Sequence, residues 1–167
     1  MKHIIIACQM LRDELTLAIN ETGCSFPVIW VDTEYHRDPN ILRVKLQEKI
    51  DAQEDVDNIL LAYGCCGNGL VGLRASTANL LIPKTDDCIS MVLSQPREKF
   101  TRQKHAYFVT KGWMESSRSI VKEYEHTVKR YGEQRARKLF DQMFKHYHSL
   151  MLIDTKAYNL EEWFSRA

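Results

Sequence analysis

The chain has 167 residues and an almost balanced charge, with 23 Lys and Arg against 22 Asp and Glu. This length is enough for one domain with a sizeable core, and 44% hydrophobic with 27% charged residues is typical of a folded globular protein. A formal net charge of +1 gives no overall field that would attract nucleic acid or an anionic membrane, so we expect neither as a partner.

The N-terminal sequence and the cysteine count indicate a compartment. The apolar run at residues 4–8 is too short for a signal peptide, and no run approaches the roughly 18 apolar residues of a membrane span. Five cysteines, an odd number, favour free or metal-bound thiols over a disulfide framework. We therefore expect a cytoplasmic protein.

Short runs rich in β-branched residues alternate with longer amphipathic segments, which is the pattern of βαβ units. Strands are expected at residues 3–8, 26–31, 58–62, 80–83, 106–110 and 150–154, and helices at 11–22, 39–50, 70–78, 85–93, 119–148 with a break near 132, and 160–166. The sequence thus predicts a single α/β domain over residues 1–167. Its sheet should be open, mostly parallel and doubly wound, with about five to six strands and helices on both faces.

Local signals place two of the helix ends. Gly23 stands where the first helix should end, because glycine readily adopts the left-handed conformation of a C-terminal cap. Asp38 and Pro39 are typical of an N-cap followed by the first helical residue.

Cysteines gather where the expected strands end, which is the edge at which open α/β sheets bind ligands. Cys8 ends the first strand, Cys66 follows the third and Cys88 follows the fourth, while His36 lies in the loop after the second. Thiolate and imidazole together suit zinc or iron. We expect Cys8, Cys66 and Cys88 to bind a transition metal, zinc first, with His36 as a fourth ligand or a general base.

Other interpretations of these thiols stay open. Each cysteine can be a small buried apolar residue, and we hold this view for Cys24 beside Gly23. Three cysteines with one open position can instead hold an iron–sulfur cluster. Cys65 and Cys66 can also form a vicinal disulfide, although such a ring is strained.

A glycine-rich loop follows the third strand. Residues 67–72 match G-x-G-x-x-G and precede an expected helix, which suggests a nucleotide- or phosphate-binding protein as an alternative. In that case the amides of Gly64, Gly67, Asn68 and Gly69 would hold a small anionic ligand, with Arg74, Lys84 or Lys111 as counter-charges. The candidate catalytic residues are His36 and Asp87.

The motif Tyr63-Gly64-x-Cys66-Gly67-Asn68-Gly69, followed by Ile82-Pro83, Asp87-Cys88-Ile89 and Thr110-x-Gly112-Trp113, resembles an uncharacterised family, a domain of unknown function found in methanogenic archaea and anaerobic bacteria. The similarity runs from Cys8 to Thr155, and Cys8, His36 and Pro39 also fit the pattern. Relatives tend to run on further, which implies that they carry a C-terminal segment that this chain lacks.

The resemblance also implies a metabolic setting, because members are often encoded beside corrinoid-dependent methyltransferase components. One hypothesis is a metal-site protein of anaerobic one-carbon metabolism, in which the metal acts as a Lewis acid or activates a thiol. The other is a non-enzymatic accessory protein that binds a metal, a cofactor or a corrinoid partner. A corrinoid protein or a methyltransferase is the expected partner in either case.

Overall fold

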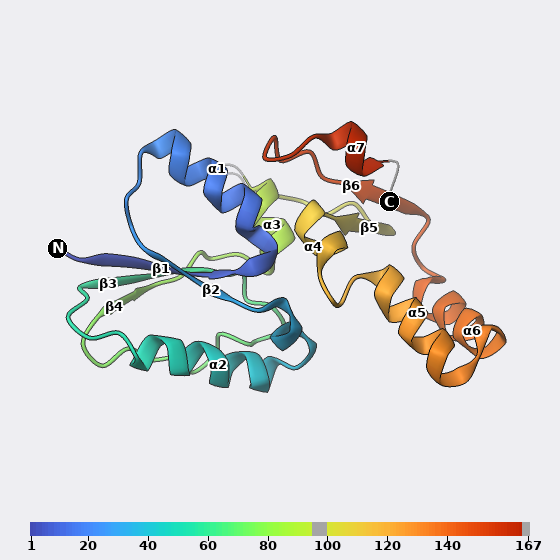
Figure 1. The fold of residues 1–167 in the computed structure, drawn as a ribbon, viewed down its shortest axis with the longest axis horizontal. Helices are drawn as coiled ribbons and strands as arrows, with labels where there is room; N and C mark the ends of the chain where they lie inside the picture. The colour runs from blue at the N-terminus through green and yellow to red at the C-terminus, as the bar shows by residue number, and fades with distance from the viewer. Residues whose placement is uncertain (95–99, 165–167) are drawn as a thin grey trace. The chain divides into compact units, whose positions relative to one another are not determined.

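The computed structural model describes residues 1–94 and 100–164, and the chain divides into two compact units, Met1–Phe100 and Thr101–Ala167. The predicted α/β class with parallel strands is confirmed (Figure 1). The six strands of the described residues are divided between a four-stranded sheet in the first unit and a two-stranded sheet in the second.

The first unit contains the four-stranded sheet. Its strands are β1 (His3–Cys8), β2 (Val28–Val31), β3 (Asn58–Ala62) and β4 (Asn79–Leu81). They are all parallel and lie in the order β2-β1-β3-β4. The chain leaves β1 on one side to form β2 and then returns past β1 to form β3. The boundary between β1 and β3 is therefore the point where the strand order reverses, and ligands of open α/β sheets bind at this point.

Helices cover both faces of this sheet, as the sequence predicts. They are α1 (Arg12–Thr22), α2 (Pro39–Asp51) and α3 (Cys88–Leu93), and the short 3-10 turns η1 (Gln9–Leu11) and η2 (Thr33–Arg37) precede α1 and α2. Figure 1 shows α1 and α2 on opposite faces.

Ile5 and Leu60 line a cavity together with Leu15 of α1 and Met91 of α3, so they point to the α1 face. Side chains alternate along a strand, which directs their neighbours toward α2. The buried residues of that second layer are Ile4, Ile6, Leu42, Leu46, Ile50, Ile59 and Leu61.

The predicted helix caps are confirmed. Gly23 ends α1 with φ 66°, and the side chain of Asp38 accepts a hydrogen bond from the backbone N–H of Asn40 at 2.8 Å, with Pro39 as the first residue of α2. Asp87 caps α3 by accepting from the N–H of Ser90 at 2.7 Å. This cap makes Cys88 the first residue of α3.

The helix expected at residues 70–78 is absent, and this prediction is wrong. The segment forms turns in which Val71 N–H donates to Asn68 and Leu73 N–H donates to Leu70. Leu70 is buried, but Val71 is exposed and Gly72 has φ 88°, so the segment buries no continuous apolar stripe and departs from the backbone conformation of a helix.

The second unit contains the parallel pair β5 (Ala106–Val109) and β6 (Ser149–Leu152). Its helices are α4 (Lys111–Glu115), α5 (Ile120–Tyr131), α6 (Glu133–Phe144) and α7 (Leu160–Phe164). The break between α5 and α6 falls at Gly132, as expected, whereas residues 165 and 166 of the last expected helix lie outside the described residues. None of the helices in the described part of the chain is long and apolar enough to cross a bilayer.

Candidate metal centre

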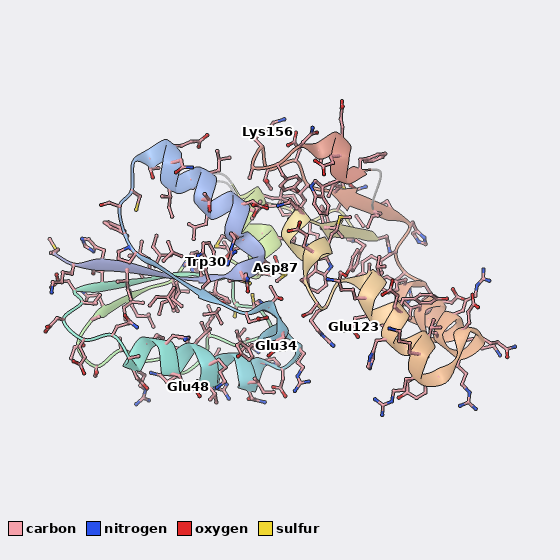
Figure 2. The ribbon with its side chains drawn as sticks, in the orientation of Figure 1. Trp30, Glu34, Glu48, Asp87, Glu123 and Lys156 are labelled. Carbon is pink, nitrogen blue, oxygen red and sulfur yellow. The ribbon has the colours of Figure 1, made fainter. Side chains whose placement is uncertain are left out.

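Four side chains meet beyond the carboxyl ends of the strands of the first unit. Cys8 is the last residue of β1, His36 belongs to η2 after β2, Cys66 follows β3, and Cys88 begins α3. Figure 2 labels Glu34 and Asp87, which lie near His36 and Cys88 in the chain, at this end of the sheet.

The distances between these side chains are short enough for a shared ion. One ligand atom from each of His36, Cys66 and Cys88 lies within 4.8 Å of the others, and this group can hold a metal ion. The Sγ atoms of Cys66 and Cys88 are 3.5 Å apart. Cys8 Sγ lies 3.9 Å from both ring nitrogens of His36. The structure thus brings together three of the four predicted residues as a group that can hold one ion, and it places the fourth, Cys8, beside His36.

The loop after β3 is held in an uncommon conformation that directs Cys66 toward Cys88. Three successive residues, Cys66, Gly67 and Asn68, have φ values of 45°, 66° and 70°, which form a single left-handed turn. The N–H groups of Cys65 and Cys66 donate to the carbonyl oxygens of Thr85 and Asp86 at 2.9 and 3.2 Å. These two bonds fix the loop alongside the segment that leads into α3.

Gly64 permits this close approach. A Cβ atom added at Gly64 would lie 2.2 Å from the backbone carbon of Asp87, so no other residue fits without displacing the chain. At Gly69 an added Cβ would lie 2.8 Å from Cδ2 of Leu42 in α2. The glycines of the loop therefore serve its packing against α3 and α2.

Burial gives the cluster an inner and an outer side. Cys8 is completely buried and Cys88 is 9% exposed, whereas His36 and Cys66 are half-buried. The ring of Tyr63 stacks on the imidazole of His36 with centroids 5.8 Å apart and an interplanar angle of 14°. A metal ion here would be approached from the side of His36 and Cys66.

The three thiols share their protons unequally. Hydrogen bonds from Cys66 and then from Cys8 lower the pKa of Cys88 well below that of an ordinary thiol. The corresponding interactions with Cys88, together with burial, raise the pKa of Cys8 and of Cys66. The metal-free cluster therefore behaves as one thiolate, centred on Cys88, with two thiol donors. A thiolate is the form that binds metal.

The other cysteines stand apart from the cluster. The Sγ atom of Cys65 lies 3.7 Å from Oδ1 of Asn68, and Cys24 follows the C-terminal cap of α1. All five cysteines are free thiols. The side chain that Cys66 meets is thus that of Cys88, rather than the neighbouring thiol of the vicinal-disulfide hypothesis.

The anion-binding interpretation of the glycine loop loses its structural basis. No helix follows Gly67, Asn68 and Gly69, so their amides do not form the N-terminus of a helix. Asp87, the second candidate catalytic residue, acts as the cap of α3. A catalytic role for His36 or Asp87 stays a prediction.

Sequence reasoning gave Tyr63 no role, although the structure places it in the wall of the centre. It is completely buried and follows Ile59 and Leu61 at alternate positions of β3 and its extension. The alternation i, i+2, i+4 was the signal that could have identified it, because these three residues share the α2 face of the sheet with Cys8.

The fold and this cluster define an α/β protein with a candidate Cys and His metal centre at the strand-order reversal. The model of the family described as a protein of unknown function, DUF1638, matches residues 30–167, and the chain belongs to this family. The match includes His36, Cys66 and Cys88, while Cys8 precedes it. Comparisons with the curated proteins and with the solved structures find no match.

Proposed function

We propose that this protein binds one zinc ion through Cys8, His36, Cys66 and Cys88. The observation that carries the proposal is the convergence of these side chains from four separate connections. Zinc–sulfur bonds of about 2.3 Å in a tetrahedral site put neighbouring sulfur ligands roughly 3.8 Å apart. The 3.5 Å between the Sγ atoms of Cys66 and Cys88 is close to this value, and Cys8 Sγ lies 3.9 Å from the ring nitrogens of His36.

The same distances favour a single ion over a [4Fe–4S] cluster. Each cysteine of such a cluster binds its own iron atom, so the sulfur ligands must stand further apart than the ligands of one ion. Cys66 and Cys88 at 3.5 Å are suited to one shared ion. Iron and acid-labile sulfide in the anaerobically purified protein would support the cluster instead.

The chemistry of the proposed centre follows from its exposed side. A bound zinc ion would keep the thiolates deprotonated and act as a Lewis acid. His36 and Cys66 are the half-buried groups at which a reactant can arrive. We extend the proposal to anaerobic one-carbon or corrinoid-dependent methyl transfer, in a reducing cytoplasm that keeps the thiols free. The resemblance of the motif at residues 63–69 supports this setting.

Metal analysis of anaerobically purified protein tests the centre. We expect about one zinc ion per chain in the wild type and in Cys65→Ser, and a loss of at least tenfold in zinc affinity in Cys66→Ser. Cys65→Ser is a matched control because it changes the adjacent thiol outside the cluster. Near-zero metal together with five freely titratable thiols would rule the proposal out.

An enzyme and an accessory protein differ in turnover. Methyl transfer from methylated donors to cob(I)alamin should require Cys66 if the centre is catalytic. If a corrinoid protein or methyltransferase binds the wild type and Cys66→Ser equally well and neither gives turnover, the protein is an accessory factor.

A further inference from the structure

We infer that Tyr63 is a positioning residue of this centre, whose phenol donates a hydrogen bond to the metal-bound thiolate of Cys8. The inference rests on the proposed metal site and assigns a supporting role to a residue that is not itself a ligand.

Strand register makes Tyr63 the neighbour of Cys8. In the parallel pair of β1 and β3, Ile4 lies opposite Ile59 and Ile6 lies opposite Leu61. Two residues further along the same face, the corresponding positions are Cys8 and Tyr63, because side chains on one face repeat every second residue.

The phenol of Tyr63 has a proton to donate and no acceptor in place. Tyr63 is completely buried, and its hydroxyl has no partner in hydrogen-bond geometry within the described part of the chain. A buried hydroxyl in that condition is unfavourable and uncommon. A phenolic hydroxyl can donate one hydrogen bond.

Metal binding would provide the missing acceptor. In the metal-free cluster the Cys8 Sγ atom lies 3.9 Å from the ring nitrogens of His36, and a thiol is only a weak acceptor. A thiolate bound to a metal carries negative charge and accepts a stronger hydrogen bond. Such outer groups orient a ligand and adjust its electron donation, and the stacking of the Tyr63 ring on His36 would fix the imidazole as well.

Tyr63→Phe removes only the phenolic oxygen and so tests this role directly. We expect zinc affinity, measured by competition with a chromophoric chelator, to fall by about tenfold or more. The thiolate-to-cobalt charge-transfer bands of the Co(II) form should shift. Tyr35→Phe, the same change one residue before His36, is the matched control and should alter neither property.

A double-mutant cycle separates positioning from general packing. If Tyr63 acts through the Cys8 thiolate, Tyr63→Phe should have no further effect on affinity in a Cys8→Ser background. Equal losses in both backgrounds, or an unchanged affinity and Co(II) spectrum in Tyr63→Phe, would overturn the role of Tyr63 while the metal centre stands. A wild-type protein that binds neither zinc nor Co(II) would overturn the proposed function, and the role of Tyr63 with it.

Discussion

Gly64→Ala should disrupt the candidate metal centre through a single methyl group. The added Cβ would lie 2.2 Å from the Asp87 carbon, 2.4 Å from its Cα and 2.5 Å from its carbonyl oxygen. Ordinary van der Waals contact begins near 3.4 Å, so the two backbones must separate by about 1 Å. Metal–ligand distances tolerate only roughly 0.2 Å, and Asp87 directly precedes the ligand Cys88. We expect a loss of about 100-fold in zinc affinity and about 1–3 kcal/mol in the free energy of unfolding.

Zinc competition and denaturant unfolding of the metal-free protein measure these two effects. Gly72→Ala is the control, because Gly72 has φ 88° and open space around the added Cβ within the described residues. That variant should lose about 1 kcal/mol through backbone strain and keep its zinc affinity. If Gly64→Ala binds zinc as tightly as the wild type, the contact with Asp87 does not position the ligands.

Three further predictions concern the thiols. Cys66→Gly and Cys66→Ala should both lose zinc, but the glycine variant should be about 1 kcal/mol more stable to denaturant, because φ is 45° at this residue. The free energy of unfolding of the metal-free protein should rise with pH up to about 9. In this range Cys8, Cys66 and Cys88 all hold their protons in the unfolded chain, whereas Cys88 has lost its proton in the folded chain. Above the ordinary thiol pKa of 9.0 the free energy of unfolding should fall, because folded Cys8 and Cys66 keep protons that the unfolded chain releases. A monotonic rise between about pH 7 and pH 10 would contradict these pKa shifts. Diamide, which accepts two electrons and two protons, should oxidise Cys66 and Cys88 to a disulfide and release bound zinc. Mass spectrometry should detect the disulfide and a zinc dye the released ion in Cys65→Ser, but neither should be seen in Cys66→Ser.

Local sequence signals were sufficient for the elements that hold the site. The strands at residues 3–8 and 58–62 have the predicted bounds, because long β-branched runs leave little ambiguity. The strand order was not readable, since it depends on tertiary pairing. The expected helix at 70–78 failed because helical spacing of a few apolar residues does not show whether a core is available to bury them.

The membership of the cluster was predictable from residue type and from the rule that ligands collect at strand ends. The sequence could not reveal how Cys66 reaches Cys88. That approach depends on the left-handed turn at residues 66–68 and on the backbone of Gly64 lying against Asp87. Both are relations between distant segments, and a glycine in the sequence does not tell which segment it will meet.

The conformation of Cys66 argues against the view that these cysteines only fill the core. A cysteine present for packing would be buried in ordinary backbone geometry, as Cys8 is at the end of β1. Cys66 is half-buried, and a non-glycine residue in the left-handed region costs roughly 1–2 kcal/mol. Apolar burial of half a small side chain offsets little of that cost. Binding of a structural zinc ion contributes about 10 kcal/mol or more, which exceeds the cost of this backbone conformation. Metal binding therefore explains why a thiol is held at this position.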